Sequence, residues 1–217
     1  MPTRPPELFR AKPNEKPMEY DPQTISHEAA YKLLIGSVIP RPIAWVSTTD
    51  GRGNHNIGAF SFFNAICPAP MLLSFAPMRN DDQQKKDTLR NIETTGVFVI
   101  NLVDEGLLEK MDLTGIPYPA EVDEFAVAGL TPQASTKIVA PLIQEAPISF
   151  ECSLYQVLHF GEPDGAGSLV IGEVVYVHVK DRVLVEGRID PNRLRPIARM
   201  GGPLYARPEI LPYRRKG

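Results

Sequence analysis

The sequence contains little cysteine. Cys67 and Cys152 are the two cysteines among 217 residues, and they lie far apart. They have neither the short spacing of a zinc site nor that of a CxxC redox pair. Two free thiols in a reducing compartment fit this pattern best, so we predict a cytoplasmic protein without a disulfide framework.

Long apolar runs are missing as well. No stretch approaches the roughly 20 apolar residues that a membrane-spanning helix needs, and the mean hydropathy is −0.15. The N-terminus shows no apolar core of the kind found in secretory signals. The net charge is −3, with both signs interspersed, which argues against a nucleic acid or an anionic membrane as the main partner.

Several signatures of catalysis are absent. The chain has no GxGxxG turn after a strand and no P-loop, so a nucleotide-like cofactor would not be held as in a Rossmann domain. The histidines His27, His55, His159 and His178 lack metal-ligand spacing. No Ser-His-Asp or Cys-His set stands out, and we therefore predict neither a metal site nor catalytic side chains.

Proline, by contrast, is abundant. The chain has 22 prolines, about double the usual share of ~5%, and six of them fall within residues 1–22. This composition predicts an extended N-terminal arm over residues 1–22. Residues 23–217 are expected to form a single domain.

Residues 40–64 organise the rest of the chain. The apolar, β-branched run at residues 42–48 predicts a strand, and residues 56–64 predict a second one. Between them, residues 50–54 contain an Asp-Gly pair that is typical of a hairpin turn. This hairpin is expected to form the floor of a cofactor site.

The remaining pattern predicts many strands and a few short helices. Strands are expected at residues 71–76, 97–103, 147–160 and 168–180. Helices are expected at residues 26–34, 85–95, 104–112 and 121–126. Because the strands follow one another through hairpins rather than helical crossovers, we predict a mainly β fold, an antiparallel barrel or sandwich.

Individual residues mark the ends of these helices. Ser26 is the expected N-cap of the first helix, and Asp87 or Thr88 that of the second, which Gly96 ends. The acidic residues at 121, 123 and 124 are expected to be exposed.

Three places could serve an anionic ligand that carries a ring. Residues 61–64 offer a hydroxyl, an amide and backbone donors, and residues 85–88 place lysines at a helix start. Arg41 adds a cation at the start of the first strand. Taken singly, each has a structural interpretation, as a strand-end cap, an N-cap or a solvated charge. Asp87 would even compete with an anion for the helix N-terminus.

Taken together, these segments resemble a known family. They are PRPIAWVST (residues 40–48), FSFFN (60–64), KDTLRNI (86–92), FVINL (98–102) and RMGG (199–202) followed by Tyr205. In this order and spacing they resemble the flavin reductase-like flavoproteins. The resemblance implies a six-stranded Greek-key, FMN-binding split barrel that forms a homodimer and holds FMN non-covalently near the dimer interface.

The resemblance also implies which residues bind the cofactor. The isoalloxazine ring would be lined by Arg41, Pro42, Ile43, Ala44, Trp45, Val46, Ser47 and Thr48. The phosphate end would be held by Ser61, Phe62, Phe63, Asn64, Lys86, Asp87 and Thr88. Arg199 and Tyr205 would approach the cofactor from the tail.

The expected activity follows from that cofactor. The protein would be an oxidoreductase that transfers hydride or electrons from NAD(P)H through FMN to an acceptor, with a partner oxygenase or electron-transfer protein. FMN carries the redox chemistry itself, which fits the lack of a catalytic dyad. Two alternatives stay open: an FMN-holding electron-transfer or flavin-binding protein without its own NAD(P)H site, and a split barrel that binds another ligand or none.

Overall fold

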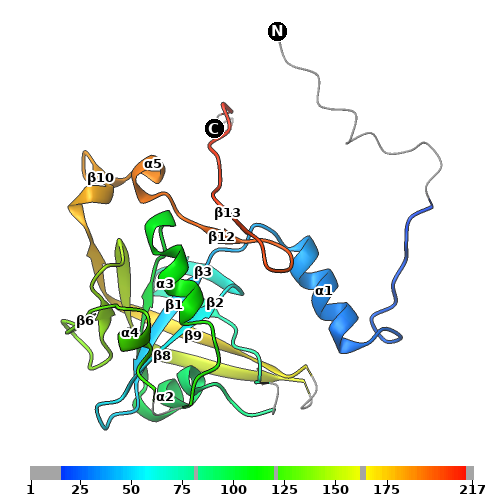
Figure 1. The fold of residues 1–217 in the computed structure, drawn as a ribbon, viewed down its shortest axis with the longest axis horizontal. Coiled ribbons are helices and arrows are strands. Elements are labelled where there is room, and N and C mark those ends of the chain that lie inside the picture. Colours follow the sequence, from blue (N-terminus) through cyan, green and yellow to red (C-terminus); the bar gives the residue numbers. More distant parts are fainter. Residues whose placement is uncertain (1–15, 81–82, 120–121, 162–164, 214–217) are drawn as a thin grey trace.

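One antiparallel sheet dominates the computed structural model (Figure 1), which describes residues 16–80, 83–119, 122–161 and 165–213. The seven strands lie in the order β2-β1-β5-β8-β9-β4-β3. Their bounds are β1 Ala44–Thr49, β2 His55–Phe60, β3 Phe63–Pro68, β4 Met71–Phe75, β5 Val97–Asn101, β8 Ile148–Phe160 and β9 Gly167–Val179. This non-sequential order is typical of a Greek key, and the predicted mainly β barrel with short helices is confirmed.

The two edge strands of this sheet, β2 and β3, follow each other directly in the chain. Ser61 and Phe62 form bends between them, and three peptide steps span at most roughly 11 Å. The sheet must therefore curl until its edges meet. The prediction of one strand over residues 56–64 was wrong, because β2 pairs with β1 whereas β3 pairs with β4. This division makes seven strands out of the expected six.

Short elements surround the barrel. The helices are α1 His27–Ser37, α2 Asp87–Thr95, α3 Leu108–Leu113, α4 Glu124–Val127 and α5 Pro191–Leu194, with 3-10 turns η2 Glu105–Leu107 and η3 Asp181–Val183. The paired small strands are β6 Pro132–Gln133 with β7 Leu142–Ile143, β10 Leu184–Val185 with β11 Arg188–Ile189, and β12 Ala198–Arg199 with β13 Tyr205–Ala206. None of the described helices is both long and apolar enough to cross a membrane.

Local sequence explains where the two longer helices begin and end. Ser26 is the N-cap of α1, and its hydroxyl accepts the amide of Ala29 at 3.2 Å. Gly96 ends α2 in the left-handed conformation, with φ 71°, which glycine adopts without steric cost. The predicted N-cap of α2 was wrong: Lys86 holds that position, without a side-chain cap, and Asp87 is the first helical residue.

The expected N-terminal arm is described only in part. Residues 1–15 lie outside the described residues, while residues 16–22 are exposed and have no helix or strand. Beside them, α1 stands apart from the barrel, next to the turn that joins β12 and β13 (Figure 1).

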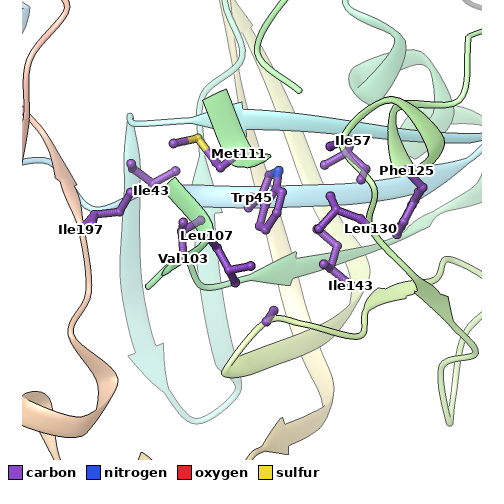
Figure 2. Close-up of a cluster of buried hydrophobic side chains, with 12 residues drawn as sticks. Ile43, Trp45, Ile57, Val103, Leu107, Met111, Phe125, Leu130, Ile143 and Ile197 are labelled. Carbon is purple, nitrogen blue, oxygen red and sulfur yellow. The ribbon is translucent and has the colours of Figure 1, made fainter. Parts of the chain in front are cut away.

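Strand β1 is buried on both faces. Ala44 and Val46 belong to a cluster inside the barrel, which α2 covers with Leu89 and Ile92. Trp45 points the other way, into a cluster built from β1, β2, α3, α4 and β7 (Figure 2). Alternate residues of a strand face opposite sides, so the continuous apolar run in the sequence is the consequence of two cores.

A buried carboxylate ties a loop to the long β8–β9 hairpin. Glu151 on β8 is fully buried and accepts three hydrogen bonds, from the amides of Thr136 at 2.6 Å and Lys137 at 2.7 Å and from His178 at 2.6 Å. Burial alone would raise the pKa of Glu151, but these hydrogen bonds outweigh it and hold the pKa below its ordinary value. The ionised carboxylate therefore stabilises the fold.

Replacing Glu151 should reveal this contribution. In Glu151→Gln, one acceptor oxygen faces three donors, and we expect the free energy of unfolding to fall by about 2–3 kcal/mol at neutral pH. The folded pKa lies below the ordinary value of 4.5, so the difference from wild type persists above that value and shrinks as the pH falls through the folded pKa. Urea unfolding across this range measures it, with exposed Glu209→Gln as control. A pH-independent difference would contradict the assignment.

Candidate functional site

A groove follows the edge strand β2. Three cavities share Ala59 and Phe60 as lining residues, and the two larger ones have volumes of about 490 and 420 Å³. Cavities of this size are typical of small-molecule sites. The wall opposite β2 comes from the loop after α3, at residues 115–117, and part of α1 closes the side with Tyr31. The groove thus collects segments that are far apart in the sequence.

The backbone of β2 turns hydrogen-bonding groups toward this groove. The amide of Ile57 donates to Glu124 Oε2 at 3.3 Å, so Ile57 directs its N–H away from β1. Antiparallel strands alternate between inward and outward pairs, and Ala59, two residues on, therefore directs its own N–H and C=O outward. Ala59 lines all three cavities, so the middle of the groove offers one donor and one acceptor.

Close packing of β2 against α2 depends on Gly58. A Cβ at this position would lie 2.9 Å from the Phe60 ring and 2.9 Å from Thr88 Oγ1. The absence of a side chain lets the first turn of α2 approach the strand that bears Ala59.

One end of the groove is cationic. Lys86, Arg79 and Ser61 line the cavity of about 420 Å³. In the described part of the chain, no carboxylate lies within ion-pair distance of Lys86 or Arg79. Arg79 was missed because it lies in an irregular loop that carries no motif. Asp87, which the sequence suggested as a competitor for an anion, is paired with Arg90, while Lys85 is paired with Glu93 at 2.6 Å.

A hydrogen-bond chain fixes the start of α2. Thr88 is only 2% exposed, and its hydroxyl donates to Asn56 Oδ1 at 2.7 Å. The amide of Asn56 donates in turn to Glu124 Oε1 at 2.8 Å. Because the carboxylate can only accept, it sets the orientation of the Asn56 amide. The Thr88 hydroxyl proton is thereby directed to Asn56 rather than into the groove.

The expectation that Glu124 is exposed was wrong. Its side chain is buried against β2, and burial raises its pKa, with the charge of Asp87 adding to the shift. Asp123 is the N-cap of α4 and accepts the amide of Phe125 at 2.9 Å. Residue 121 lies outside the described residues. An acidic run resembles a surface segment in the sequence, whereas the partner of Glu124 is a strand edge 67 residues away.

Arg41 has a structural position. It is 4% exposed, and its guanidinium donates to the carbonyls of Ile35 at 2.6 Å and Val38 at 2.9 Å, at the end of α1. It also donates to the carbonyl of Met200 at 3.0 Å and to Ser61 Oγ at 3.2 Å. Arg41 therefore joins α1, the tail and the bend after β2, and most of its donors already have partners.

The structure places the predicted site residues in three groups. Those that line the groove are Arg41, Ile43, Ser61, Phe62, Lys86, Asp87, Thr88, Arg199 and Tyr205. Those buried behind it are Ala44, Trp45, Val46, Ser47 and Thr48. Pro42, Phe63 and Asn64 line a neighbouring apolar cavity, which shares Arg41, Ser61 and Phe62 with the groove.

The buried group supports the groove from behind. Trp45, Val46 and Ser47 pair with β2 on one side and with β5 on the other, so their backbone groups are used within the sheet. The indole N–H of Trp45 donates to Thr114 Oγ1 at 2.8 Å, and Thr114 itself lines the groove. The apolar run at β1 thus positions the surface that a ligand would meet.

Such a groove defines a class of protein. Cations at its ends, an outward-facing amide and carbonyl at its centre and apolar side chains along it suit a flat ring with an anionic chain. The profile of the Flavin reductase like domain matches residues 35–194. The chain belongs to the flavin reductase-like family.

Relatives and solved structures agree with this assignment. A protein of Aquifex aeolicus is 41% identical over 191 residues, 88% of this chain and 95% of its own length. The structure of nitrilotriacetate monooxygenase component B from Bacillus cereus is similar, with a TM-score of 0.86 and 34% identity over 91% of this chain and 98% of that one.

Two further structures extend the comparison. The 2-nitrobenzoate 2-nitroreductase NbaA of Pseudomonas fluorescens has a TM-score of 0.81 and 31% identity, over 92% of this chain and 96% of that one. A split-barrel protein from Shewanella frigidimarina has a TM-score of 0.77 and 23% identity, over 93% of this chain and all of that one. The fold is thus a split barrel, and the chain is a flavin-related oxidoreductase.

Adding one methyl group to β2 should disturb the site. Gly58→Ala forces apart the buried Phe60 ring and the Thr88 hydroxyl, and we expect it to lower the free energy of unfolding by about 1–3 kcal/mol. Gly36→Ala in α1 is the matched control, since its Cβ meets nothing within 4 Å and alanine favours a helix. Urea unfolding of both variants makes the comparison. Equal stability of the two variants would show that α2 tolerates a side chain here.

Proposed function

We propose that this protein is an FMN-dependent oxidoreductase that transfers hydride or electrons from NAD(P)H through FMN to an acceptor. The observation that carries the proposal is the groove along β2. Lys86, Arg79 and Ser61 gather at one end, and the outward-facing N–H and C=O of Ala59 lie in the middle. These are the groups that a phosphate and a heteroaromatic ring edge require.

The donor set at the cationic end suits the phosphate of FMN. Lys86 and Arg79 would make charge-assisted hydrogen bonds with phosphate oxygens, and Ser61 would add a hydroxyl. Lys86 is also the N-cap of the nine-residue helix α2, and the unpaired amides at a helix N-terminus favour an anion. Because Asp87 is paired with Arg90, its charge opposes this site less than the sequence suggests.

The middle of the groove suits the isoalloxazine ring. Ala59 would meet the polar edge of the ring with one donor and one acceptor, while Ile43, Met111, Ile116 and Pro117 provide apolar contacts. Bound FMN would supply the hydride acceptance and donation, whereas the chain orients the ring and excludes water. Residues 44–48 hold β2 in place from behind, and Arg199 and Tyr205 close the far end.

Similarity to the B. cereus monooxygenase component supports a partner oxygenase as the consumer of reduced flavin. The absorption spectrum of the purified protein, with the released cofactor identified, tests the flavin, and oxidation of NADH or NADPH tests the donor. Reduction by a protein donor but not by NAD(P)H would instead identify an FMN-holding electron carrier. A protein that takes up no FMN would exclude both functions.

The phosphate assignment predicts weaker FMN binding on substitution. Lys86→Ala, Arg79→Ala and Ser61→Ala each remove one contact, and each charge-assisted bond contributes about 1.5–3 kcal/mol, or about 10- to 100-fold in Kd. Trp45, the single tryptophan, reports binding because a flavin in the groove quenches its fluorescence by energy transfer. Exposed Lys137→Ala serves as control. Unchanged Kd values in the Lys86 and Ser61 variants would refute the assignment.

We also propose that the protein is a homodimer whose second copy covers α1. None of the residues of α1 is buried, and Leu34 and Val38 are 53% and 58% exposed. They line the apolar cavity of about 490 Å³ that adjoins the groove at Arg41 and Ser61. An isolated helix of 11 residues is marginal in water, so α1 needs a partner surface to hold Tyr31 at the groove.

A charge on this helix should separate the copies. Leu34→Glu would place a carboxylate in the apolar interface, and we expect sedimentation velocity to show monomers where the wild type is a dimer. Val139→Glu is the control, because Val139 is 73% exposed and lies in the loop between β6 and β7. FMN affinity should fall with dissociation, since α1 lines the groove. A wild type that sediments as a monomer would exclude the dimer.

A further inference from the structure

The far end of the groove brings two arginines together. Arg41 and Arg199 lie opposite each other in an antiparallel bridge, in which each amide donates to the other's carbonyl at 2.9 Å. Both side chains line the groove cavity of about 490 Å³ that also contains Tyr31 and Tyr205, at the end of the groove away from Lys86. Arg199 does not line the cavity that contains Lys86, Arg79 and Ser61, so the two cationic ends are distinct.

The charges at this end are unbalanced. Asp112 is the carboxylate that lines the same cavity, and its Oδ1 accepts the hydroxyl of Tyr205 at 2.8 Å. Burial, together with this hydrogen bond, raises the pKa of Tyr205, so the phenol adds no negative charge. Two guanidinium groups therefore face one carboxylate.

Arg199 is the cation of this pair that can take a ligand. Four acceptors already occupy the guanidinium of Arg41. The guanidinium carbon of Arg199 lies 4.6 Å from the centre of the Tyr205 ring, and within the described ranges no carboxylate is within ion-pair distance of it. Stacking on a ring fixes the guanidinium plane and leaves its N–H edge available for an oxyanion.

One oxyanion cannot serve both ends of the groove. If the FMN phosphate binds at Lys86 and Arg79, an anion that Arg199 binds belongs to another molecule. We propose that Arg199 anchors a phosphate group of the second reactant, a nicotinamide nucleotide that donates hydride, and that Tyr205 holds the guanidinium in place. This proposal rests on the proposed function and names the residue that would anchor its hydride donor.

Comparison of two hydride donors tests the anchor. NADH carries phosphates, whereas N-benzyl-1,4-dihydronicotinamide has the same reacting ring and no charge. In FMN-loaded Arg199→Met we expect the ratio of kcat/KM for NADH to that for the neutral donor to fall by about tenfold or more, through the KM for NADH. Arg199→Lys keeps the charge and should retain part of the ratio. Arg207→Met is the matched control, because Arg207 is exposed on the same tail and paired with Glu105.

A binding measurement provides a readout that does not depend on turnover. Calorimetric titration of FMN-loaded protein with pyrophosphate should show binding to wild type and its loss in Arg199→Met. An equal fall of kcat/KM for NADH and for the neutral donor in Arg199→Met would overturn the proposal. Arg199 would then contact the flavin or stabilise the fold. An unchanged ratio, or pyrophosphate binding that Arg199→Met retains, would also overturn it. Binding of benzoate but not pyrophosphate would assign the oxyanion to an organic acid instead.

These outcomes differ from a failure of the proposed function. A protein that takes up no FMN, or whose FMN neither donor reduces, would remove the flavin reductase assignment itself. Reduction by both donors, with a ratio that Arg199→Met leaves unchanged, would leave that assignment intact and exclude the anchor alone.

Discussion

The buried guanidinium of Arg41 holds together segments that the chain separates widely. Arg41 is only 4% exposed. Its guanidinium donates to carbonyls at the end of α1, to the tail and to the bend where β2 ends. A guanidinium buried this deeply needs acceptors for its donors, because an unpaired one would be costly. The positions of α1, of the tail and of Ser61 are consequently coupled. The far end of the groove forms where these three segments converge on one side chain.

Hydrogen bonding also determines how the backbone of the edge strand β2 is protected. An open edge strand exposes amides and carbonyls that invite pairing with other chains. Here Glu124 occupies the amide of Ile57, and the groove encloses Ala59, two residues further on. The barrel thus remains split at the place where β2 would otherwise need another strand. The unpaired backbone groups that are a liability on most sheets form the polar centre of the groove here.

Features that depend on local sequence were predictable. The Ser26 hydroxyl caps α1 and Gly96 ends α2 in the left-handed conformation, as predicted, and the long strands β8 and β9 lie close to their predicted bounds. The resemblance carried by five short motifs gave the family and the split barrel, which composition could not do. Lys86 and Ser61 do line one cavity, although their ligand stays a prediction.

Features that depend on distant contacts were not predictable. The strand break at Ser61 arises because its two halves have different neighbours, and the burial of Glu124 arises from a strand that closes over it. Nothing near Arg79 signals a ligand. The apolar run of β1 looked like a lining for a ring, yet both of its faces serve cores and both of its edges are paired.

The tail has a consequence for how such a barrel can diversify. The strands that carry Arg199 and Tyr205 form their own small sheet, which a backbone bridge joins to Arg41, ahead of β1. Ile197 and Tyr205 pack against the core around Trp45, so a change in the tail that keeps these two side chains can alter which molecules the groove admits while that core stays intact.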